Sequence, residues 1–203
     1  MSDDTRTRVL HAAGPIFAEK GCDGATVREI CAAAEANLAS VNYHFRDKET
    51  LYLETVTLAH TLRLQQVPPP ATPDDAPPED KLRRFIEAML SRMLGTRELG
   101  WQTRLMMREM LHPTAACKPL VEEFIRPQLN QLLAILDELL PEQTPQHRRI
   151  QTAFSIVGQC LHYRVAREFV DILVPAAERD AHYSSPQLAE HITQFTLAAL
   201  RLP

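Results

Sequence analysis

Several features that would assign this sequence to a class at once are scarce in it. Its 203 residues include only six glycines and one tryptophan, and aromatic residues make up 6% of the chain. Basic residues are not in excess, since 22 Lys and Arg stand against 26 Asp and Glu, for a net charge of −4. A whole-chain attraction to nucleic acid or to anionic membranes is therefore excluded, and any such binding must come from a local arrangement of groups.

The four cysteines form no CxxC pair and no metal-ligand spacing. They are typical of small core residues in a reduced compartment. No apolar run approaches the ~18 residues that a membrane span needs, and the first residues contain no apolar signal core. We therefore expect a cytoplasmic protein without a membrane segment.

Catalytic and cofactor motifs are missing as well. The chain has no HExxH, no GxSxG and no glycine-rich phosphate loop, and its histidines are scattered singly. We expect no enzyme activity, no cofactor and no metal site.

What the chain does contain is apolar residues at helical spacing along almost its whole length, with no sustained period-two alternation. We predict an all-α fold of about nine helices. A capping box of Thr26 and Glu29 opens a short helix, Asn37 caps the next one over residues 38–45, and Asp47 caps a fourth. Gly14 and Pro15 predict a bend in the first helix, which Lys20 and Gly21 end. Further helices are expected over 80–95, 101–111, 119–140 with a kink at Pro127, 145–173 and 186–202.

The segment 67–80 holds six of the fifteen prolines, so it is expected to be neither helical nor part of a sheet. It predicts a stiff connector or an exposed loop, with the connector placed over 67–79. We expect a helix-turn-helix DNA-binding domain over 1–50 and a helical effector-binding and dimerisation domain over 51–203.

Two short helices joined by residues 35–37 have the size of a helix-turn-helix, whose second helix enters the DNA major groove. That helix carries small side chains beside an unusual run of polar and aromatic ones, which suits base edges and phosphates. The predicted DNA-binding residues are Thr26, Arg28, Asn37, Leu38, Ala39, Ser40, Asn42, Tyr43, His44 and Lys48. An ordinary α-hairpin with a polar surface, acting as a helical protein-interaction module, remains an alternative.

The segments FAEKG (17–21), TVREICAAAEANLASVNYHF (26–45) and DKETLY (47–52) resemble the N-terminal domain of the TetR family of bacterial transcriptional regulators. MREMLHPT (107–114), EEFIRPQLNQLL (122–133) and IVGQCLHYRVAR (156–167) are similar to its CecR-like branch. Glu35 departs from the usual turn glycine, and Asn42 stands where an aromatic is more usual. The resemblance implies a repressor-type dimer with a DNA domain and an effector domain, and it does not carry over a ligand.

Methionines cluster in the two helices after the connector, alongside the only tryptophan, and could line an adaptable apolar pocket. Plain core packing is the alternative. Arg108 shares a helix face with Leu105 and needs an anionic ligand or an internal partner, for which Glu122 or Glu123 is favoured. The predicted effector-binding residues are Met89, Met93, Trp101, Leu105, Arg108, Phe124 and Tyr163.

The helix over 145–173 carries two apolar ribbons, which indicates burial on both faces. With the last helix it predicts a four-helix homodimer interface, although a large monomeric bundle remains possible. The predicted interface residues are Phe154, Leu161, Leu188, Ile192 and Phe195. The sequence thus predicts a repressor-type regulator that leaves a palindromic double-stranded DNA operator when a small apolar or amphipathic effector binds.

Overall fold

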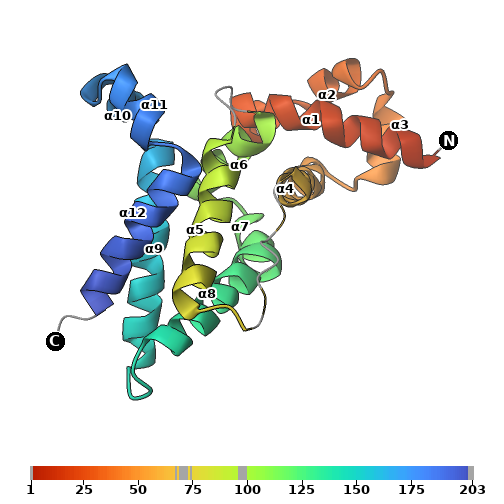
Figure 1. Ribbon diagram of the computed structural model, residues 1–203. Coiled ribbons are helices and arrows are strands. Elements are labelled where there is room, and N and C mark those ends of the chain that lie inside the picture. The colour runs from red at the N-terminus through yellow and green to blue at the C-terminus, as the bar shows by residue number, and fades with distance from the viewer. Residues whose placement is uncertain (1, 67, 69–72, 74, 96–99, 201–203) are drawn as a thin grey trace. The chain divides into compact units, whose positions relative to one another are not determined.

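A computed structural model describes residues 2–66, 68, 73, 75–95 and 100–200 (Figure 1). Every regular element in these ranges is helical, which confirms the predicted all-α fold. None of the described helices is both long enough and apolar enough to cross a bilayer. The chain divides into two compact units, which we call the N-terminal unit (Met1–Gln66 with Glu98–Ile125) and the C-terminal unit (Val67–Arg97 with Arg126–Pro203).

The N-terminal unit is built around three helices that pack on one another, α1, α4 and α6. Its core is apolar, with Phe17 and Leu105 fully buried. Its elements are α1 (Ser2–Gly24), α2 (Val27–Ala33), α3 (Leu38–His44), α4 (Lys48–Gln66), α6 (Trp101–Leu111), α7 (Cys117–Leu120) and the π-helical turn η1 (Val121–Ile125).

The short helices of this unit begin where the sequence predicts. The Thr26 hydroxyl and the Glu29 carboxylate form the predicted capping box at α2. The Asn37 side chain accepts a hydrogen bond from the Ser40 N–H at 2.7 Å, and Asp47 accepts one from the Thr50 N–H at 2.7 Å. Hydrogen bonding from the Thr50 side chain, and then from its N–H, lowers the pKa of Asp47. Because each cap joins a residue to one three positions later, a short stretch of sequence is enough to predict it.

At two positions of α1 the structure explains why the residue is glycine. Gly21 lies at φ 74°, which interrupts the helix at the predicted stop. At Gly14, where a bend is predicted, the structure shows helical backbone through Pro15. A Cβ at Gly14 would lie 2.4 Å from the Trp101 ring, so the missing side chain makes room for α6 to pack on α1.

The C-terminal unit centres on α5, which packs against α8, α9 and α12. Phe85, Leu90, Leu132 and Ile156 lie fully buried between these helices. Its elements are α5 (Pro78–Leu94), α8 (Arg126–Leu139), α9 (Gln146–Val165), α10 (Arg167–Leu173), α11 (Ala176–His182) and α12 (Ser185–Leu200).

Three helix boundaries differ from the prediction. The predicted helix over 119–140 is divided into α7, η1 and α8, so the irregular turn η1 lies just before Pro127. Pro127 is in the first turn of α8, where a residue without a backbone N–H is tolerated. The helix over 145–173 breaks at Ala166, where φ is −93° and ψ 19°. The sequence does not predict α11. Residues 67, 69–72 and 74 of the connector lie outside the described residues, and its last two residues, Pro78 and Glu79, are already helical because proline is tolerated at the first position of α5.

The compact units also differ in extent from the two predicted domains. Helix α4 and the described segment 100–125 belong to the same unit as the helix-turn-helix, where α4 and α6 pack on α1 and on each other. Residues that the prediction assigns to one effector domain therefore belong to two cores.

Candidate nucleic-acid interface

The turn between α2 and α3 is tight and slightly strained. Glu35 has a φ of 49°, in the left-handed region where a Cβ costs ~1–2 kcal/mol. The Ala36 N–H donates to the Cys31 carbonyl at 3.0 Å and closes the turn. Glycine suits this backbone best, so a glutamate here is tolerated at a cost.

One side of α3 is anchored in the N-terminal core. Val41 and Phe45 are buried, and they join Ile30 of α2 in one apolar cluster. Phe45 thus anchors the end of α3 in this core. Because both anchors point inward, the opposite side of α3 faces solvent.

The outer side of α3 combines small, polar and aromatic groups. Tyr43 is 82% exposed and Leu38 47% exposed, and Ala39 and Asn42 are exposed beside them. The Tyr43 ring meets the His44 ring edge-on at 5.2 Å. Such a face can approach base edges closely at Ala39, offer both a donor and an acceptor at Asn42, and reach phosphates with the phenol hydroxyl.

Three of the other predicted DNA-binding residues also have structural roles. Thr26 and Asn37 cap their helices through side-chain oxygens. The Lys48 ammonium donates to the carbonyls of Asp23 at 3.4 Å and Ala25 at 3.3 Å. An ammonium has three N–H donors, so one remains for a phosphate.

Two of the cations near α3 are held in ion pairs. Lys20 bonds Glu29 at 2.5 Å, and Arg6 bonds Glu54 at 2.5 Å. The hydrogen bond from Lys20, with those from Thr26, lowers the pKa of Glu29 to about 2. Arg28 and Arg46 are exposed, and neither forms an ion pair with a residue in the described part of the chain.

A buried carboxylate in this unit is absent from the sequence prediction. Glu109 of α6 is fully buried and accepts hydrogen bonds from the Tyr52 hydroxyl at 2.8 Å and the Thr114 N–H at 2.8 Å. Burial of the Tyr52 hydroxyl raises its pKa, and the hydrogen bond to Glu109 raises it further. The signal was present in the sequence, because Glu109 lies four residues after buried Leu105 on the same helix face.

The predicted effector residues do not form one group. Trp101, Leu105 and Phe124 belong to the N-terminal core, whereas Met89, Met93 and Tyr163 belong to the C-terminal core. The Arg108 guanidinium donates to the carbonyls of Glu19 at 3.4 Å and Lys20 at 3.2 Å, since backbone acceptors near the end of α1 lie within its reach. The expected pairing with Glu122 or Glu123 stays a prediction.

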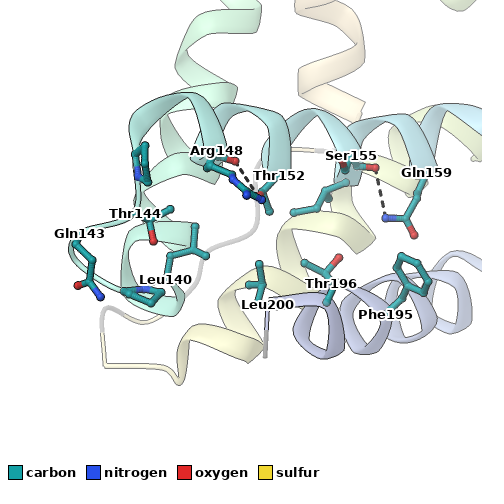
Figure 2. A pocket seen from close by; sticks show the side chains of 14 residues that line it. Leu140, Gln143, Thr144, Arg148, Thr152, Ser155, Gln159, Phe195, Thr196 and Leu200 are labelled. Atoms are coloured by element: carbon teal, nitrogen blue, oxygen red, sulfur yellow. Dashed lines mark hydrogen bonds between the residues drawn. The ribbon is translucent and has the colours of Figure 1, made fainter. Parts of the chain in front are cut away.

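The C-terminal unit contains two cavities beside α9 and a further one of about 420 Å³ along α5. One of about 450 Å³ includes Tyr163 with Arg167 and Arg179. The other, of about 510 Å³, lies between α9 and α12, where Figure 2 shows Thr152 and Gln159 facing Thr196 and Phe195. Thr152 and Gln159 donate to carbonyls of their own helix, at 2.9 and 3.3 Å. None of the predicted effector residues lines this second cavity.

The predicted dimer residues separate into exposed and buried ones. Phe154 and Phe195 are 59% and 58% exposed, as a partner-facing position requires. Leu188 and Ile192 are buried in the core of their own unit, so they cannot contact a partner without repacking. One turn of α12 thus places Ile192 inward and Phe195 outward.

Two family models match the chain. The model of the C-terminal domain of the HTH-type transcriptional dual regulator CecR matches residues 78–200. The model of bacterial regulatory proteins of the tetR family matches residues 9–55 and so includes α2 and α3.

Individual proteins are similar over nearly the whole chain. The HTH-type transcriptional dual regulator CecR of Shigella flexneri is 26% identical, over 83% of this chain and 79% of that protein. HlyIIR, a hemolysin II transcriptional regulator, is 20% identical with a TM-score of 0.60 and full coverage of both chains. AibR, crystallised with isovaleryl coenzyme A and operator DNA, is 17% identical with a TM-score of 0.65, covering 94% of this chain and 97% of AibR. The two solved structures show that the fold is shared.

Proposed function

Because this chain belongs to the TetR family of bacterial transcriptional regulators, with a CecR-type C-terminal domain, we propose that it is a homodimeric repressor. It binds a palindromic operator through α3 and leaves the DNA when a small apolar or amphipathic molecule binds its C-terminal domain. The predicted functional domains, 1–50 and 51–203, are part of this proposal.

The observation that carries the proposal is the two-sided character of α3. Val41 and Phe45 fix it from within, while Leu38, Asn42 and Tyr43 stand exposed without a structural role in the described chain. An exposed helix seven residues long, with a phenol at 82% exposure, would gain nothing in stability from these groups. A major groove accommodates such a helix and uses all three side chains.

A dimer is supported by Phe154 of α9 and Phe195 of α12, whose large apolar side chains are more than half exposed. Gly158 is an exposed residue of α9 one turn after Phe154, and a Cβ there would meet no atom within 4 Å. Two such faces related by a two-fold axis would bury each other and set the distance between the two α3 helices.

Effector control is supported by the adaptable methionines of α5 and by the cavities of the C-terminal unit. A solved regulator of the same fold, AibR, holds an acyl thioester together with operator DNA. That likeness supports the ability of the fold to hold both ligands. A release of DNA requires that the effector bind the DNA-free conformation more tightly.

Fluorescence anisotropy with DNA from upstream of the gene tests DNA binding. We expect Tyr43→Ala to weaken operator and random DNA about equally. Asn42→Ala should also relax base preference by ~1–3 kcal/mol if its amide reads a base edge. Tyr43→Phe is the matched control, since it keeps the ring and removes only the hydroxyl. A folded wild-type dimer that binds no upstream DNA would favour the protein-interaction module instead.

A further inference from the structure

One side chain of α6 hydrogen-bonds the backbone near the end of α1. Arg108 donates to the carbonyls of Glu19 and Lys20, directly before the break at Gly21. These carbonyls lie in the last turns of α1, directly before its kink, where a cation near the carbonyl end of a helix is favourable. A Cβ at Gly21 would lie 2.5 Å from the Arg108 guanidinium, so the glycine makes the contact possible.

The next residue of α6 binds a different helix. Glu109 accepts the Tyr52 hydroxyl of α4 at 2.8 Å, and both side chains are buried. The Thr114 N–H and hydroxyl occupy the other lone pairs of the carboxylate, so it is well solvated by the protein. Removing one partner of such a buried set leaves unpaired polar groups, which is costly.

The same region is also held from α4. Lys48, one turn before Tyr52, donates to the carbonyls of Asp23 and Ala25. We call residues 19–26, which connect α1 to α2, the α1–α2 junction. Arg108 binds its beginning and Lys48 its end, while Glu109 and Tyr52 join the two helices that carry these cations.

These contacts form a closed circuit of α6, α4 and the α1–α2 junction. We propose that Arg108 and Glu109 are positioning residues that set the direction in which the junction presents α2 and α3 to DNA. The inference rests on the proposed function as a DNA-binding dimer. Neither residue lies on the outer side of α3, and Glu109 is fully buried, so their effect on DNA passes through the position of the helix-turn-helix.

Three substitutions test the circuit while preserving shape. Arg108→Met removes the charge, Glu109→Gln removes the carboxylate, and Tyr52→Phe removes only the hydroxyl, leaving the ring packed edge-on against Phe17 at 5.0 Å. Arg104→Met is the matched control, because Arg104 is an exposed arginine of the same helix. Arg108→Lys should restore part of the function, since an ammonium can also bind carbonyls.

The decisive readout is operator half-site spacing. Operators with one or two base pairs added or removed between half-sites are compared for each variant. We expect Arg108→Met and Glu109→Gln to lose at least tenfold affinity for the natural spacing and to change the preferred spacing. A merely destabilised protein would lose active molecules and weaken all spacings alike. Folded variants that keep both the affinity within twofold and the wild-type spacing preference would overturn the proposal.

A measurement on the free protein separates this proposal from the proposed function. Hydrogen exchange of the amides in residues 19–34 should be at least tenfold faster in Arg108→Met than in Arg104→Met. That result is expected even if the wild-type protein binds no DNA, in which case only the proposed function fails. Equal exchange in the two variants would show that Arg108 does not hold the junction, whatever the DNA result.

Discussion

Glu35 adopts a left-handed backbone in the turn between α2 and α3. Glycine at this position would remove a steric cost of ~1–2 kcal/mol but would add ~0.5–1 kcal/mol of chain entropy to be lost on folding. We therefore expect Glu35→Gly to raise the free energy of unfolding by roughly 0.5–1 kcal/mol. This change in stability is measured as a shift in the midpoint urea concentration of unfolding, with the m-value of the transition unchanged.

Glu35→Ala is the control for that substitution, because it removes the carboxylate but keeps the Cβ. Both variants should bind DNA somewhat more tightly, since each removes a negative charge close to α3. Only the glycine variant should be stabilised. Equal stabilisation of both would assign the effect to charge and not to the backbone.

Single residues were predictable where their partners are close in sequence. Thr26, Asn37 and Asp47 cap helices that begin one residue later, so the pattern sufficed. The partners of Arg108 on α1 and of Glu109 on α4 were not predictable in this way, because they lie more than fifty residues away in the sequence. A backbone carbonyl as acceptor leaves no trace in the sequence.

Among the helices, boundaries followed the same rule. The ends of α6 and the starts of α3 and α4 agree with the prediction because caps, glycines and prolines mark them. The division of 145–173 at Ala166 and the existence of α11 were missed. Neither has a strong local signal, and both depend on how the chain returns from α9 to α12.

The outward faces of α9 and α12 carry the proposed dimer contact. Phe195→Asp would bury an unpaired carboxylate against a partner, which is costly. We expect the dimer to dissociate at least tenfold more readily or the protein to become insoluble. Light scattering over a concentration series gives the molar mass.

Phe169→Asp is the matched control, because Phe169 of α10 is the same side chain at 71% exposure, outside α9 and α12. It should remain as dimeric as the wild type. An unchanged dimer for Phe195→Asp would remove α12 from the interface. Monomers from Phe169→Asp as well would extend the interface to α10.

For the whole molecule, Trp101 offers an optical reporter of effector action. It is the only tryptophan, and its ring packs on Gly14 of α1. We expect effectors that release operator DNA to shift or quench its emission over the same concentration range. A full switch from 1:99 to 99:1 requires ~5.5 kcal/mol of differential binding, so weaker ligands should give partial release.

Met93→Ala and Trp101→Phe serve as tests of where the effector binds. Both should weaken the response to the effector while leaving DNA binding in its absence unchanged. DNA release with no emission change, and undiminished in both variants, would place the effector site away from these residues.

The paired cations of the N-terminal unit also affect how the protein would search a chromosome. Lys20 and Arg6 are occupied by Glu29 and Glu54, so these two cations are less available to displace counterions from phosphates, whereas the exposed Arg28 and Arg46 can do so. Since the salt dependence of binding scales with the number of displaced counterions, we expect operator affinity to fall less steeply with ionic strength than it would if all of these cations bound phosphates. Fewer phosphate contacts also weaken non-specific binding, which would shorten the time that the protein spends sliding along DNA.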